Sequence, residues 1–457
     1  MLTGFIKFAL GDQHSVVMKQ DGSVWSTAVI LNSGIGLSGG GGNHFAQMIA
    51  SGATAVAAGK GFSIALKKDG KVWAVGRNYK GQLGDGTKNR RDSYFLVQII
   101  PGAKQVAAGG GHSMVVTYDG SLWATGWNKY GQLGGWATSY SVRFFKTIID
   151  DAAAVAAGSD HTIVMKKDGT VWAAGGNYNG QLGDGSHHQR TLFVEVLSEA
   201  IAISAGGAHS MVLTGDGSVW GTGCNENGQL GDGSLMERTQ FMRVVFGGAK
   251  AIATGSRHTV MLQLDGSLWA TGYNRYGQLG DGSKDSSRIF VQVISDGVKA
   301  IAAGRRHSII LKQDGSVWAT GYNRYGQLGD GLMTDHKVFM QVISAGVKCV
   351  AAGAFHSMVL AQDGSIWATG SNRYGQLGDG STANVYTFVR LRPFSNGAGH
   401  TNIYMLTMQH YFLRPPALLR TDHHSVITSR FCESDTATSH HFHKNISYHF
   451  DSGKENH

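Results

Sequence analysis

Histidine and aspartate, two residue types that bind metals and transfer protons, recur at fixed spacing along about the first 390 residues of this 457-residue chain. A histidine stands in a Gly-x-x-His-[Ser/Thr] string, and an aspartate stands in a Gly-Asp-Gly string. What these residues do depends on whether the fold brings the copies together. The histidines singled out are His112, His161, His209, His258, His307 and His356, and the aspartates are Asp85, Asp184, Asp232, Asp281, Asp330 and Asp379.

Other strings that could indicate chemistry are poor matches. Gly34, Gly36 and Gly39 form a Gly-x-Gly-x-x-Gly string, but no helical pattern follows it, as a dinucleotide site would require. The Gly-Asp-Gly segments lack the Gly-Lys-Ser/Thr of a phosphate loop and the alternating acidic ligands of a calcium loop. No nucleophile with a partnered base is visible. The sequence therefore predicts no catalytic residue, no metal ligand and no cofactor-binding residue, and it indicates that the chain is not an enzyme.

The string Asp-Gly-x-aliphatic-Trp occurs eight times at steps of 48 to 50 residues, and it identifies an internal repeat. Eight of the ten tryptophans occupy its last position. Short apolar runs flank each Asp-Gly pair, as at Asp363-Gly364, which predicts a two-residue hairpin turn whose residues tolerate positive φ. Further apolar runs, as at residues 290–294 and 301–304, bring the expected number of short strands per unit to four.

One four-stranded sheet cannot cover its own apolar faces, whereas sheets stacked around an axis cover each other and leave no long free edge. The sequence thus predicts an all-β fold with a single β-propeller over residues 1–392. Alanine suits strands crowded toward the axis, and tryptophan fills the wider space between sheets. Equivalent histidines around a ring cannot converge on one ion, so we expect hydrogen-bonded structural roles for the histidines and aspartates.

The combined string G-x-x-H-[ST]…DG-x-[VIL]-W-A-x-G-x-N-x-x-G-Q-L-G-D-G resembles the repeat of the regulator of chromosome condensation family over about residues 4–392. The resemblance implies a propeller that usually has seven blades. Because the sequence contains eight turn-and-tryptophan units, we expect seven blades with eight as the alternative. The first unit has diverged from the other copies, since after Trp25 only Leu37 matches the Gly-Gln-Leu-Gly-Asp-Gly segment. In the second unit Phe62 replaces the repeated histidine.

Positions that differ between copies are the better guide to function, because identical positions serve the fold. Arginine and tyrosine, which protein interfaces prefer, gather in the loops of the last three units. The sequence predicts a basic, tyrosine-lined patch across adjacent blades, and the alternative is ordinary solvated loop residues in similar copies. The predicted partner-binding residues are Arg257, Arg275, Tyr276, Arg305, Arg306, Arg324, Tyr325, Arg373 and Tyr374.

The formal charge of +9 belongs to the repeat region, because residues 393–457 hold five Lys/Arg and five Asp/Glu. Such a surface favours acidic partners of any kind and does not select DNA. Residues 393–457 are rich in histidine without a repeat, and we expect an irregular, poorly ordered C-terminal tail. Three scattered cysteines indicate neither a disulfide framework nor a zinc site, and no apolar run is long enough for a membrane span. We expect an intracellular setting, cytoplasmic or nuclear.

The leading interpretation is a non-enzymatic scaffold that binds a protein partner through inter-strand loops on one face of the propeller. The founding family member catalyses guanine-nucleotide exchange on the small GTPase Ran, so the resemblance implies exchange on a Ran-like GTPase as an alternative. Association with chromatin or nucleic acid through a basic face is the other alternative. A plant ultraviolet-B photoreceptor is also similar, but this sequence has no Gly-Trp-Arg-His string and light sensing is not expected.

Overall fold

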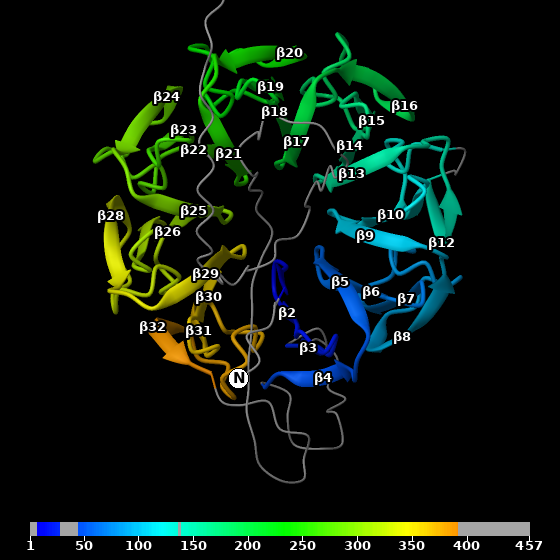
Figure 1. The fold of residues 1–457 in the computed structure, drawn as a ribbon, viewed down its shortest axis with the longest axis horizontal. Helices are drawn as coiled ribbons and strands as arrows, with labels where there is room; N and C mark the ends of the chain where they lie inside the picture. Colours follow the sequence, from blue (N-terminus) through cyan, green and yellow to red (C-terminus); the bar gives the residue numbers. More distant parts are fainter. Residues whose placement is uncertain (1–6, 28–43, 136–138, 392–457) are drawn as a thin grey trace, which may run out of the picture.

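The strands of the protein form eight antiparallel sheets of four strands each in this computed structural model, which describes residues 7–27, 44–135 and 139–391. Within every sheet the strands follow one another in chain order. The sheets stand as blades around an axis, with the first strand of a blade innermost and the fourth outermost (Figure 1). The predicted all-β propeller is confirmed.

The blades are numbered 1 to 8 in chain order. Blades 1 to 4 comprise β1 (Lys7–Leu10), β2 (Ser15–Met18), β3 (Val24–Ser26) and β4 (Ala46–Ile49); β5 (Ala53–Ala58), β6 (Phe62–Lys67), β7 (Lys71–Gly76) and β8 (Arg91–Ile99); β9 (Ala103–Ala108), β10 (His112–Thr117), β11 (Leu122–Trp127) and β12 (Tyr140–Lys146); and β13 (Ala152–Ala157), β14 (His161–Lys166), β15 (Val171–Gly175) and β16 (Arg190–Leu197).

Blades 5 to 8 comprise β17 (Ala200–Ala205), β18 (His209–Thr214), β19 (Val219–Gly223) and β20 (Arg238–Val245); β21 (Ala249–Thr254), β22 (His258–Gln263), β23 (Leu268–Gly272) and β24 (Ser287–Ile294); β25 (Val298–Ala303), β26 (His307–Lys312), β27 (Val317–Gly321) and β28 (His336–Ile343); and β29 (Val347–Ala352), β30 (His356–Ala361), β31 (Ile366–Gly370) and β32 (Val385–Arg390).

The number of blades is eight, so the expectation of seven was wrong and the alternative was correct. The divergent first unit still supplies a complete sheet, β1 to β4. That sheet closes the ring, because Phe8 and Trp25 of blade 1 share one apolar cluster with Met358 and Leu377 of blade 8. Residues 393–457, predicted as the tail, lie outside the described residues.

The Asp-Gly turn differs from the prediction in one respect. Gly364 adopts a φ of 79°, but Asp363 is not among the residues with positive φ. Gly364 N donates to Ala361 O at 3.0 Å and Ser365 N donates to Asp363 Oδ1 at 2.7 Å, so the turn begins at Ala361, three residues before the glycine. A turn of this kind, with glycine alone in the left-handed region, also suits the twist of a hairpin.

The apolar core lies between neighbouring sheets. One cluster combines Leu268 and Leu279 of blade 6 with Val298 and Ile301 of blade 7, and the half-buried Trp318 of blade 7 packs against it. Every blade from 2 to 8 places its repeat tryptophan at such an interface, which confirms the packing role predicted for this residue. Among the described residues, no helix has the length and apolar character needed to cross a membrane.

Candidate interaction face

A histidine in every blade except blade 2 links its blade to the next one. His307 Nε2 lies 2.9 Å from Ser357 Oγ, and that hydroxyl donates to Gln327 O at 2.7 Å. Because the single hydroxyl proton goes to the carbonyl, the proton between the two side chains sits on Nε2. The series closes the ring, since His356 of blade 8 lies 3.0 Å from Ser15 of blade 1.

Burial keeps these histidines uncharged. It lowers the pKa of His112 and His209 to about 4 and that of His307 to about 3. In the part of the chain that the structure describes, no group of histidine, cysteine, aspartate or glutamate side chains could hold a metal ion. The predicted structural role of the repeated histidines is confirmed. His14 was not among the predicted histidines, although it stands in a Gly-x-x-His-Ser string, and its Nε2 lies 2.6 Å from Ser63 Oγ.

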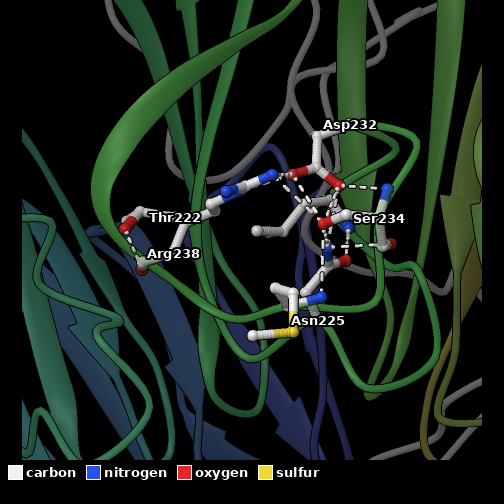
Figure 2. A network of polar contacts seen from close by, with 7 residues as sticks. Thr222, Asn225, Asp232, Ser234 and Arg238 are labelled. Carbon is white, nitrogen blue, oxygen red and sulfur yellow. Dashed lines mark hydrogen bonds and ion pairs between the residues drawn. The ribbon is translucent and has the colours of Figure 1, made fainter.

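The repeated aspartates stabilise their own loops, as Figure 2 shows for blade 5. Asp232 accepts hydrogen bonds from Asn225 Nδ2 at 2.8 Å, Ser234 N at 3.0 Å and Arg238 Nε at 2.5 Å. Burial alone would raise the pKa of Asp232, but these hydrogen bonds outweigh it and hold the pKa below its usual value. Bonding to backbone amides was predicted and is confirmed, whereas the asparagine and arginine partners were not predicted.

The same loop packs onto the next blade. Gly233 N donates to Arg288 O at 2.7 Å. Gly231 has a φ of 76°, and a Cβ on it would lie 2.5 Å from the ring of Phe290. Only glycine permits both the backbone conformation and the close approach. The loop positions that most copies share therefore hold neighbouring blades together.

In each of blades 2 to 8, two loops emerge at the same end of the propeller, which we call the loop face. In blade 6, His258 at the start of β22 pairs with Gly272 at the end of β23. Residues 255–257 and 273–286 therefore leave the sheet at one edge. The equivalent loops of blades 7 and 8 do the same, and these loops carry all nine predicted partner-binding residues.

Five of the nine residues form a connected group or flank it directly. The guanidinium of Arg306 lies 5.1 Å from the ring centroid of Tyr276, and its Nη1 donates to the Tyr276 hydroxyl at 3.2 Å. Tyr325 packs edge-on against Phe355 at 5.5 Å, and Arg305 lies over Phe355 at 5.6 Å. Arg324, next to Tyr325, is exposed. Three neighbouring blades thus contribute to one cluster.

The other four predicted residues lie on the same face, outside this cluster. Arg257 is exposed and forms an ion pair with Glu226 of blade 5 at 2.8 Å. Arg275 and Arg373 are exposed, and Tyr374 is half-buried. Whether any of the nine residues binds a partner stays a prediction.

Three aromatic residues of the cluster were not predicted. Tyr322 is 8 % exposed and lies at the centre of the group. Its ring centroid lies 4.9 Å from that of Tyr276 in the preceding blade. Tyr273 lies 6.0 Å from Tyr276, and Phe355 lies 6.2 Å from Tyr322. The sequence held a signal for Tyr273 and Tyr322, which both follow the glycine that ends the third strand of their blade. This position varies between copies as strongly as the positions on which the prediction of the partner-binding residues was based. We call Tyr273, Tyr276, Arg305, Arg306, Tyr322, Tyr325 and Phe355 the arginine–tyrosine cluster.

A second aromatic group lies on the loop face over blades 2 to 4. Lys80 lies 4.7 Å from the ring centroid of Trp127, which lies 5.4 Å from Tyr130. Tyr130 in turn meets Tyr178 of blade 4 at 5.7 Å. Lysine replaces arginine in this group, and blade 5, with Glu226, separates it from the arginine–tyrosine cluster.

Comparisons with known proteins agree with this geometry. The RCC1-like domain model matches residues 193–413. Two models of the regulator of chromosome condensation (RCC1) repeat match residues 53–82, 103–132 and 152–181, and residues 69–116 and 168–213. No enzyme family is among these models. Comparison with curated proteins finds no match.

Solved structures show the same fold. Human WBSCR16 aligns with a TM-score of 0.60 at 20% identity, over 70% of this chain and 94% of that chain. Yeast RCC1 (Prp20) bound to Kap60 aligns with a TM-score of 0.60 at 21% identity, over 70% and 83%. Prp20p from Saccharomyces cerevisiae, described with its binding to Gsp1p and histones, aligns with a TM-score of 0.60 at 20% identity, over 72% and 87%. At such identities the likeness to these structures establishes the fold alone. The matched repeat and domain models show that this chain belongs to the regulator of chromosome condensation (RCC1) repeat family.

Proposed function

We propose that this chain is a non-enzymatic protein-binding scaffold that takes its partner on the loop face of blades 6 to 8. The single observation that carries the proposal is the arginine–tyrosine cluster, which gathers side chains from three blades at positions that the fold does not need. Arginine and tyrosine are enriched among the residues that dominate the binding energy of protein interfaces, and both combine apolar area with hydrogen-bonding groups. An intracellular setting, cytoplasmic or nuclear, belongs to the same proposal.

The test compares two triple variants of the full chain in affinity capture from native lysate. The first, Arg275→Ala with Arg324→Ala and Arg373→Ala, removes three exposed charges around the cluster. The matched control, Lys68→Ala with Arg288→Ala and Lys337→Ala, removes three exposed charges at the opposite end and on outer strands. We expect the control to retain the partners of the wild type and the first variant to lose them. Equal retention by both variants would overturn the proposal.

A second candidate is guanine-nucleotide exchange on a small Ran-like GTPase, supported by the fold likeness to the yeast protein described with Gsp1p. This support is weak, because a shared fold hosts many functions. Nucleotide release from a panel of small GTPases, measured with and without the chain, tests it, and no acceleration would dismiss it. Association with nucleic acid or chromatin requires binding that falls steeply with salt, and binding insensitive to salt would dismiss that alternative.

A further inference from the structure

Two consecutive arginines of blade 7 are held in place by rings from three blades. The guanidinium of Arg306 lies 5.1 Å from the ring centroid of Tyr276 and 5.9 Å from that of Tyr322. Arg305 lies 5.6 Å from the ring centroid of Phe355. Stacking against rings orients the planar guanidinium and limits the conformations that a ligand would otherwise have to restrict on binding.

The rings that hold the arginines are themselves fixed by one another. Tyr276 and Tyr322 meet at an interplanar angle of 72°, and Tyr325 and Phe355 meet at 73°. Tyr322 and Phe355 join the two pairs at 61°. Edge-to-face packing of this kind is favourable and directional, so the cluster forms a preorganised base under the two guanidinium groups.

The positive charge of these arginines is not neutralised within the described residues. No carboxylate there lies within 4.0 Å of Arg305 or Arg306, whereas Arg257 of blade 6 already pairs with Glu226 at 2.8 Å. Burial raises the pKa of Tyr322, and the negative charge of Asp335 acts in the same direction. The Asp335 carboxylate accepts a hydrogen bond from Asn323 N at 2.9 Å. An oriented guanidinium without a carboxylate matches a carboxylate in a two-bond, side-by-side geometry.

We infer that Arg305 and Arg306 bind the carboxylate of an acidic side chain in a peptide segment of the partner protein. This inference rests on the proposed function and names the chemistry of the partner. A nucleic acid fits less well, because single strands bind by stacking bases on open ring faces. Here the rings meet edge to face, and the guanidiniums lie over Tyr276, Tyr322 and Phe355.

The experiment measures fluorescence anisotropy of a short labelled peptide of alternating glutamate and tyrosine with the full chain. The same peptide with glutamine in place of glutamate keeps its length and aromatic content. We expect the glutamate peptide to bind at least about tenfold more tightly than the glutamine peptide. Equal affinities would overturn the inference, as would tighter binding of a labelled thymidine oligonucleotide than of the glutamate peptide.

Substitutions that preserve charge separate guanidinium recognition from general attraction. Arg306→Lys keeps the positive charge but removes the planar fork, and we expect affinity for the glutamate peptide to fall about tenfold. Arg243→Lys is the control, because Arg243 of blade 5 lies outside the loop face and is already paired with Asp216 at 3.0 Å, and we expect it to leave affinity unchanged. An Arg306→Lys variant that binds as wild type would contradict the inference, and Arg305→Lys serves as the second variant if Arg306→Lys does not fold.

Failure of the inference and failure of the proposed function give different results. If the triple variant at Arg275, Arg324 and Arg373 loses the lysate partners while glutamate and glutamine peptides bind alike, the interaction face stands and the carboxylate receptor is wrong. If that triple variant captures the same partners as wild type, the proposed function is wrong irrespective of the peptide result.

Discussion

Different contacts join neighbouring blades at two places in the ring, namely the interface between blades 1 and 2 and the interfaces among blades 6, 7 and 8. Thr320 and Thr369 each donate to a glycine carbonyl of the preceding blade, at 2.8 and 2.7 Å. Blade 2 has Val75 at this position, and residues 28–43 contain no Gly-Gln-Leu-Gly-Asp-Gly string. At this position blade 2 therefore has no side-chain hydroxyl that could donate to a loop carbonyl of blade 1.

Other contacts join blades 1 and 2. His14 Nε2 lies 2.6 Å from Ser63 Oγ, and Lys7 Nζ donates to Thr54 O at 2.5 Å. Burial lowers the pKa of Lys7 to about 8, so this amine is held in an unfavourable environment for a charge. The strands of blade 1 are also short, with three or four residues each, against five to eight in blade 7.

The first unit, although divergent, receives the loop of the preceding blade as other blades do. In the described parts of blades 2 to 8 this loop packs onto the next blade, so the intact loop of blade 8 engages blade 1. Gly378 of blade 8 approaches Phe45 in the way Gly329 of blade 7 approaches Phe388, and Ser15 Oγ donates to Gln376 O at 2.8 Å. The described contacts between blades 8 and 1 therefore match those between blades 7 and 8.

Acid should produce the largest effect, because it acts on the histidines of many blades at once. Above the ordinary histidine pKa of 6.5 the rings are neutral in both states and contribute no pH dependence. As pH falls below 6.5 only the unfolded chain takes up protons, since the folded pKa values of His112, His209 and His307 lie at about 4, 4 and 3. The free energy of unfolding should fall by up to about 1.4 kcal/mol per pH unit for each histidine.

Urea unfolding at pH values between about 7 and 5 measures this dependence. His307→Phe, which installs the residue that blade 2 carries at Phe62, removes one titrating group and should make the dependence shallower. A free energy of unfolding that stays constant over the range would contradict the account of the histidine ring.

Removing a loop asparagine should have the next largest effect. Asn177 is buried, accepts from Leu182 N at 3.0 Å and donates to Asp184 Oδ1 at 2.9 Å. Asn177→Ala leaves both partners without this bond and should cost about 1–3 kcal/mol, measured by thermal or urea unfolding. Tyr178→Ala, at the exposed neighbouring position, is the matched control, with an expected change within about 0.5 kcal/mol. Similar losses in the two variants would show that the loop contacts do not hold the ring.

Local opening should distinguish the two regions by a smaller margin. Amides of β2 and β3 in blade 1 should exchange hydrogen faster than those of β26 and β27 in blade 7, by about tenfold or about 1.4 kcal/mol. The physical reason is the shorter strands of blade 1 and the presence of Val75 in blade 2 where blades 6 to 8 have a threonine. Hydrogen exchange resolved by peptide measures both regions in one sample, and equal protection would remove the difference between them.

The fold was predictable because each repeat unit carries its own strands, turn and tryptophan. The number of blades was misjudged where the family resemblance was preferred to the count of Asp-Gly-x-Trp strings in this chain. The clustering of Tyr322 and Phe355 with Tyr276 was not predictable in the same way. Those contacts join residues of different blades, and their distances depend on the angle between sheets rather than on any local pattern.

The most direct measurement compares two variants for both stability and binding. The central claim is that shared positions hold the ring while the varying positions of blades 6 to 8 bind the partner. Asn177→Ala should lower the melting temperature and leave the affinity of the folded protein for the glutamate–tyrosine peptide unchanged, whereas Arg306→Lys should leave the melting temperature unchanged and weaken that affinity. Two variants that lose stability and affinity together, or an Arg306→Lys variant that loses neither, would contradict the claim.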